Sequence, residues 1–142
     1  MAVTQRFIVY GEPKGKGRPR FNKFGKPSTP EQTVNYETLV KMEYHNQCGN
    51  FRFPDDAPID ARLMVYYPIP KSTSKKKQEM MRQHKLRPMK KPDLDNVCKM
   101  ILDALNQIAY RDDTQIVDCQ IRKFYSDTPR VVVTLTQLEE TE

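Results

Sequence analysis

Two aspartates and a lysine lie within one short segment, and a third aspartate follows across a turn. In an extended segment, residues two apart point to the same side, so the carboxylates of Asp93 and Asp95 converge if the chain is still extended through Asp93. Inside a helix the same side chains would point about 200° apart. Lys99 shares a helix face with Asp95 because it is four residues further on. With Asp113, these spacings predict an acidic site that has an amine beside it.

Phosphodiester hydrolysis is the chemistry that such a site can perform. Three crowded carboxylates repel one another, and a hard divalent cation removes that conflict. Oxygen-only ligation is the preference of Mg²⁺, which can activate a water and stabilise the leaving oxygen. A nearby lysine adds positive charge to the transition state. We therefore predict that Asp93, Asp95 and Asp113 hold the metal, and that these three and Lys99 are catalytic.

Each of these residues also has an ordinary structural interpretation. Asp93 or Asp95 can cap a helix N-terminus, and a lysine four residues from Asp95 can form a surface ion pair. Asp112 followed by Asp113 is typical of a turn. The residue pattern alone leaves these interpretations open, and it does not say whether Asp112 or Asp118 shares the metal role.

The positive charge of the chain is concentrated in two blocks. The net charge is +6, and segment 71–91 contains nine lysines and arginines against one acid, Glu79. Segment 14–26 contains six more. Such blocks favour a polyanionic partner, although a solvated surface is the ordinary alternative. As DNA contacts we predict Lys14, Lys16, Arg18, Arg20, Lys75, Lys76, Lys77, Lys90 and Lys91.

The elements that must position these side chains follow from hydrophobic periodicity. The pattern predicts strands at 6–10, 59–67, 117–122 and 131–135, and helices at 30–48 and 94–108. Segment 72–86 is a basic helix or loop with a thin apolar stripe, so we expect segment 71–91 to be mobile, and 139–142 to be frayed. The order of elements predicts one α+β domain over 1–142, with a small mixed sheet packed against helices.

Composition excludes several classes of protein. The 3 cysteines contain no CxxC pair, which fits reduced thiols better than a disulfide framework or a zinc site. There is no secretory signal and no run of about 18 apolar residues, so we expect a cytoplasmic protein without a membrane span. Segment 11–16 lacks one spacing residue of a P-loop, so no nucleotide cofactor is expected.

The central motif resembles that of a known family. KPDLDNVCKMILDALN at 91–106, followed by DDTQIV at 112–117, closely resembles the RusA family of Holliday junction resolvases, which are crossover junction endodeoxyribonucleases. GEPKGKGRPR at 11–20 and STSKKK at 72–77 are also similar to many members. The resemblance implies a RusA-like fold, a homodimer, and Mg²⁺ as the cofactor, with Mn²⁺ as an alternative ion.

Transferred residue by residue, the resemblance matches the family's catalytic residues to Asp93, Asp95, Lys99 and Asp113, and gives Asn96 and Asp103 structural roles. It implies paired symmetric nicks in a four-way junction during recombination and repair, with 5′-phosphate and 3′-hydroxyl ends, by a bacterial or prophage-encoded protein. A basic DNA-binding protein without catalysis, and a nuclease of flaps or forks, are the alternatives. The cleavage sequence, the number of metal ions and the dimer interface stay open.

Overall fold

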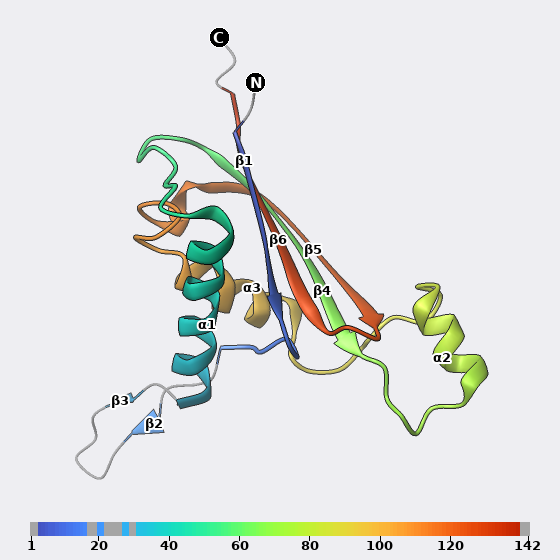
Figure 1. Cartoon of the computed structure of the whole chain (residues 1–142). Coiled ribbons are helices and arrows are strands. Elements are labelled where there is room, and N and C mark those ends of the chain that lie inside the picture. The colour runs from blue at the N-terminus through green and yellow to red at the C-terminus, as the bar shows by residue number, and fades with distance from the viewer. Residues whose placement is uncertain (1–2, 17–19, 22–26, 29–30, 140–142) are drawn as a thin grey trace.

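Four strands form one mixed sheet in the order β1-β6-β4-β5 (Figure 1). The computed structural model describes residues 3–16, 20–21, 27–28 and 31–139. β6 (Arg130–Gln137) runs antiparallel to both β1 (Thr4–Tyr10) and β4 (Ile59–Pro68), whereas β5 (Ile116–Ser126) lies parallel to β4 at the sheet edge. A parallel pair needs a long crossover connection, and the segment between β4 and β5 supplies it.

The helices are arranged around this sheet. α1 (Glu31–Cys48) and α3 (Leu94–Ala104) lie on one face, and α2 (Lys75–Arg82) lies beyond the ends of β4 and β5 (Figure 1). A short 3-10 helix, η1 (Asp113–Gln115), precedes β5. β2 (Arg20–Phe21) and β3 (Pro27–Ser28) pair separately as a two-stranded antiparallel sheet. The predicted α+β fold with a small mixed sheet is confirmed.

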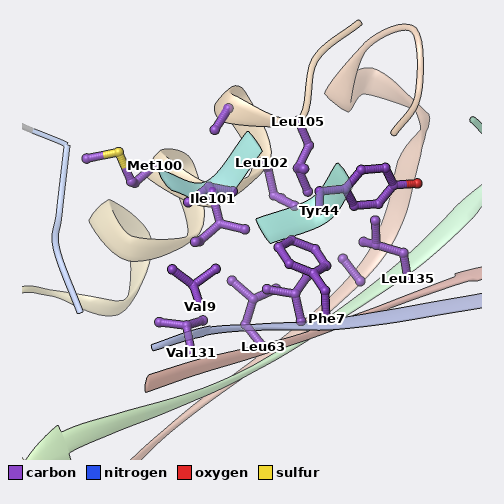
Figure 2. Close-up of a cluster of buried hydrophobic side chains, with 14 of the residues drawn as sticks. Phe7, Val9, Tyr44, Leu63, Met100, Ile101, Leu102, Leu105, Val131 and Leu135 are labelled. Carbon is purple, nitrogen blue, oxygen red and sulfur yellow. The ribbon is translucent and has the colours of Figure 1, made fainter. Parts of the chain in front are cut away.

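The hydrophobic core lies between the sheet and the two helices. The alternation that predicted the strand at 59–67 is confirmed, since the buried residues of β4 are Ile59, Ala61, Leu63, Val65 and Tyr67. Successive strand side chains point to opposite faces, so this set faces the helices. Figure 2 shows Leu63 and Val131 in one cluster with Ile101 of α3 and Tyr44 of α1. The apolar faces of α1 and β6 therefore serve the core.

α3 ends one turn earlier than its apolar pattern predicted. The pattern extends to Ile108, but the helix stops at Ala104. Gln107 has a φ of 64°, in the left-handed region, and its N–H donates to the Tyr110 carbonyl at 2.8 Å. Ile108 still packs against the core from the turn. An apolar residue at helical spacing can thus pack in the core although it lies beyond the end of the helix. Periodicity alone does not distinguish this case from a longer helix.

The other two helices agree with the prediction in part. α1 ends at Cys48 as expected, followed by Gly49 at a φ of 67°, where glycine is favoured. Its predicted first residue, Pro30, lies outside the described residues. α2 is shorter than segment 72–86, and the Ser74 side chain caps it by accepting the Lys77 N–H at 3.3 Å. Over the described ranges, none of the helices has the length and apolar character needed to span a membrane.

We predict that Met100→Ala lowers the free energy of unfolding by about 2–5 kcal/mol, because Met100 is fully buried and its loss leaves a cavity. Met89→Ala is the matched control, since that side chain is 97% exposed. It should change the free energy by less than about 0.5 kcal/mol. Urea denaturation followed by circular dichroism measures both, and equal effects would contradict the assigned core.

Candidate active site

The two aspartates of the central motif lie at the start of α3. Asp93 is the N-cap residue and has extended dihedrals (φ −69°, ψ 155°), the condition under which its carboxylate can point the same way as that of Asp95. Its side chain makes no capping hydrogen bond. Both carboxylates are exposed, and neither has a hydrogen bond or ion pair with another residue of the described ranges. Asp93 is therefore the N-cap of α3 by position and backbone conformation, while its carboxylate is left available to a ligand.

The segment before α3 is fixed to the ends of the two parallel strands. The Tyr67 hydroxyl of β4 donates a hydrogen bond to the Pro92 carbonyl. Lys123 of β5 donates from Nζ to the Lys90 carbonyl at 2.7 Å. These bonds place Asp93 near the C-terminal ends of β4 and β5, where it is exposed to solvent.

A basic loop packs against the first turn of α3. A Cβ atom at Gly15 would lie 3.0 Å from the Cβ atoms of both Asn96 and Pro92, so a larger residue there would push these neighbours aside. The Lys16 N–H donates to the Asn96 carbonyl at 3.4 Å. The Lys16 side chain continues to Asp103, with Nζ 2.6 Å from Oδ2. Lys16, a predicted DNA contact, thus forms an ion pair on α3 in this structure.

Asp113 is held in place by the turn that follows α3. Its backbone N–H donates to Oδ1 of Asn106 at 2.9 Å. Two residues later, Gln115 donates from Nε2 to the carbonyls of Pro54 and Ala57 at 2.9 and 3.1 Å. The glutamine of the DDTQ sequence therefore attaches this turn to the loop before β4.

Asp113 contacts Asp103, for which the family resemblance implies a structural role. Desolvation, and then a hydrogen bond with the Asp103 carboxyl, raise the pKa of Asp113. Asp103 in turn raises the pKa of Lys16 through their hydrogen bond. One carboxyl group therefore binds both an ammonium and a second carboxyl group. Asp103 lies eight residues after Asp95, and this helical spacing was the signal in the sequence that could have identified it.

Asp95, Lys99 and Asp103 form a stripe along one face of α3, because residues four apart share a helix face. The rise along the helix separates the two ends of this stripe by about 12 Å. Lys99 is exposed and forms no ion pair within the part of the chain that the structure describes. Its amine is therefore available to a substrate.

The carboxylates are gathered at two places along this stripe. Asp93 and Asp95 lie at its start, and Asp113 lies with Asp103 at its other end. No group of three or more acidic, histidine or cysteine side chains within the described ranges is arranged to hold a metal ion. Exposed carboxylate oxygens are suitable ligands for Mg²⁺, but a single ion would require Asp113 to move towards Asp95.

The two aspartates left open by the sequence have other surroundings. Asp112 accepts a hydrogen bond from Thr114 Oγ1 at 2.7 Å, and this bond lowers the pKa of Asp112. Asp118 pairs in register with Asp60, whose neighbour Ala61 is buried under the helices. Asp118 therefore lies on the face of the sheet opposite α3. Neither aspartate adds a carboxylate to the stripe.

The predicted DNA contacts lie on both flanks of α3. α2 and the small sheet of β2 and β3 lie on opposite sides of the molecule (Figure 1). Exposed lysines of this set are Lys14, Lys75, Lys76, Lys77, Lys90 and Lys91. Arg18 lies outside the described residues, and for Arg20 only the backbone, in β2, is described.

The α+β fold and the carboxylate–lysine motif on one helix are features of a nuclease family. The family model described as "Endodeoxyribonuclease RusA" matches residues 10–136. The chain therefore belongs to the RusA family of endodeoxyribonucleases, which confirms the resemblance seen in the central motif. It is also 39% identical over 141 residues to the "Uncharacterized protein YqaN" of Bacillus subtilis (strain 168), covering 94% of this chain and 96% of that protein.

Removing the charge of Asp112 and removing that of Asp113 should change the stability of the fold in opposite directions. A carboxyl group with a raised pKa in the folded state, as at Asp113, stabilises the fold at low pH, and this stability is lost as pH rises through the folded pKa. Asp112 has a lowered pKa, so its contribution is present at neutral pH and lost in acid. We predict that Asp113→Asn raises the melting temperature at pH 7 and that Asp112→Asn lowers it.

Thermal unfolding of the two variants and the wild type in EDTA measures these shifts without bound metal. At a pH below the pKa values of both carboxyl groups, the melting temperature of each variant should lie closer to that of the wild type. Shifts of the same sign at neutral pH would contradict the contact between Asp113 and Asp103.

Proposed function

We propose that the protein is a Mg²⁺-dependent endonuclease that resolves four-way DNA junctions by paired symmetric nicks. The observation that carries this proposal is the family match over residues 10–136, whose central motif lies on one exposed helix face. Asp93, Asp95 and Lys99 are exposed there, without ion pairs among the described residues. Unpaired charges of both signs on a rigid helix are suited to binding a phosphate together with its counter-ion.

Asp93, Asp95 and Asp113 would hold the divalent cation. A bound ion of this kind supplies Lewis acidity at the phosphate and lowers the pKa of water. In this structure the Asp103 carboxyl contacts both Asp113 and Lys16. Asp113 can therefore bind the cation only if its own carboxyl moves away from Asp103. Asp103 can then remain paired with Lys16, which keeps its charge neutralised.

Lys99 would act on the phosphate directly. Its position four residues after Asp95 places the ammonium next to the carboxylates at the start of α3. Negative charge increases on the phosphate oxygens as the phosphodiester bond breaks, and a fixed ammonium stabilises that charge. Products with 5′-phosphate and 3′-hydroxyl ends can be sealed by a ligase, as resolution of a junction requires.

The basic flanks would bind the DNA arms. Lys75, Lys76 and Lys77 lie in the first turn of α2, and Lys90 and Lys91 come just before Pro92 and Asp93 in the sequence. Phosphate contacts fix orientation and carry no sequence information, so preference for a junction would come from the geometry of a homodimer. Because the apolar faces of α1 and β6 are in the core, the dimer interface would use other surfaces.

We predict that Asp95→Asn and Lys99→Ala each lower the nicking rate on a four-way junction in Mg²⁺ by about 100-fold or more, since each removes a charge that acts on the reacting phosphate. Asp118→Asn is the matched control, because this exposed aspartate lies on the opposite face of the sheet. It should nick like the wild type. Gel analysis of labelled junctions measures all four proteins.

Three outcomes would contradict the proposal. Equal nicking by Asp95→Asn and the wild type would overturn the site. Faster cleavage of flaps or forks than of junctions would change the substrate. Tight junction binding that is indifferent to Mg²⁺ and to Asp95→Asn, without nicking, would favour a DNA-binding protein that does not cleave. That alternative is considered because no group of three metal-binding side chains is preformed in the described ranges.

A further inference from the structure

Two cysteines that are distant in the sequence lie in contact between α3 and β5. Their Sγ atoms are 3.8 Å apart. Cys98 is half-buried on α3, and Cys119 is exposed on β5. Cys119 pairs in register with the buried Ala61, so its side chain lies on the sheet face that α3 covers. The proposed nuclease mechanism uses neither thiol.

The two thiols differ in reactivity. The hydrogen bond from Cys98 lowers the pKa of Cys119 to about 7, because it stabilises the thiolate. The same bond and burial raise the pKa of Cys98. Cys119 is therefore the thiol of the pair that loses its proton more readily, and it is exposed to solvent. The thiolate is the form that attacks a peroxide.

We propose that Cys98 and Cys119 form a reversible disulfide bond when the protein meets hydrogen peroxide. The Cys119 thiolate attacks one peroxide oxygen, the O–O bond breaks, hydroxide leaves, and a sulfenic acid forms on Cys119. Cys98 then loses its proton, and its sulfur attacks the Cys119 sulfur and displaces the oxygen as water. The two cysteines are oxidised by two electrons, and the peroxide is reduced. A thiol reductant reverses the bond.

The bond would alter the nuclease site. A disulfide holds its sulfurs about 2.05 Å apart, so the 3.8 Å contact must shorten by nearly 2 Å. Cys98 directly precedes Lys99 on α3. Drawing α3 towards β5 would displace Lys99, and a misplacement of about 1 Å can reduce a rate by about 100-fold. This consequence for activity rests on the proposed function, whereas the bond itself does not.

The remaining cysteine provides an internal control. Cys48 is half-buried on α1, where its thiol donates a weak hydrogen bond to the Arg6 carbonyl at 3.7 Å. Burial raises the pKa of Cys48, so it reacts slowly with peroxide. Its sulfur contacts neither of the other two cysteines. Cys48 should therefore remain a free thiol while the pair is oxidised.

The experiment compares the reduced full-length protein before and after dilute hydrogen peroxide, in EDTA. Of its 3 cysteines, the wild type should lose two titratable thiols, and Cys48→Ser should lose both of those that remain. Peptide mass spectrometry after alkylation should find the Cys98–Cys119 linkage in both proteins, and dithiothreitol should remove it. Retention of all thiols, or a bridge that involves Cys48, would overturn the proposal.

Nicking of a four-way junction tests the consequence. The oxidised wild type should nick at least about 10-fold more slowly than the reduced protein, and recover with dithiothreitol. Cys119→Ser should be insensitive to peroxide. Unchanged nicking by a fully bridged protein would overturn the effect on the site. If the reduced wild type does not nick at all, the proposed function fails, while thiol titration and peptide mapping still decide whether the bond forms.

Discussion

The packing of α3 against the sheet is the constraint on which the site depends. Val97, Met100, Ile101 and Ala104 are buried against the strands. Because residues on a helix repeat every 3.6 positions, burial of this face turns the opposite face, with Asp95 and Lys99, to solvent. Substitutions in the buried face would move these charged groups even though they are not part of the stripe. Stability and the geometry of the site therefore depend on the same helix.

At the Asp103 end of the stripe, two carboxyl groups lie close together, which is electrostatically unfavourable. The Asp113 carboxyl lies against that of Asp103, and partial burial and the like charge both oppose its ionisation. The ammonium of Lys16 forms an ion pair with Asp103, so it directly neutralises the charge of Asp103 alone. Natural proteins retain such conflicts mainly where function requires them. A divalent cation near Asp113 would remove the conflict, which connects this local strain with the proposed chemistry.

Much of the fold could be predicted from local sequence patterns. Alternation identified β4, and apolar spacing identified α3 and its exposed acidic face, because one face of each element must be buried. The contacts of Asp113 with Asp103 and of Cys98 with Cys119 were not predicted, because both depend on how the turn after α3 folds back. Spacing also placed the end of α3 too late, since Ile108 packs against the core from outside the helix. Tertiary contacts of this kind leave little local signal.

A crystal structure of the protein with Mn²⁺, in which anomalous scattering locates the ion, tests the proposed metal site most directly. We expect an ion at the start of α3, bound by Asp93 and Asp95, with the Asp113 carboxyl moved away from Asp103 to join them. An ion bound elsewhere, with these three carboxylates unliganded and Asp113 still against Asp103, would contradict it.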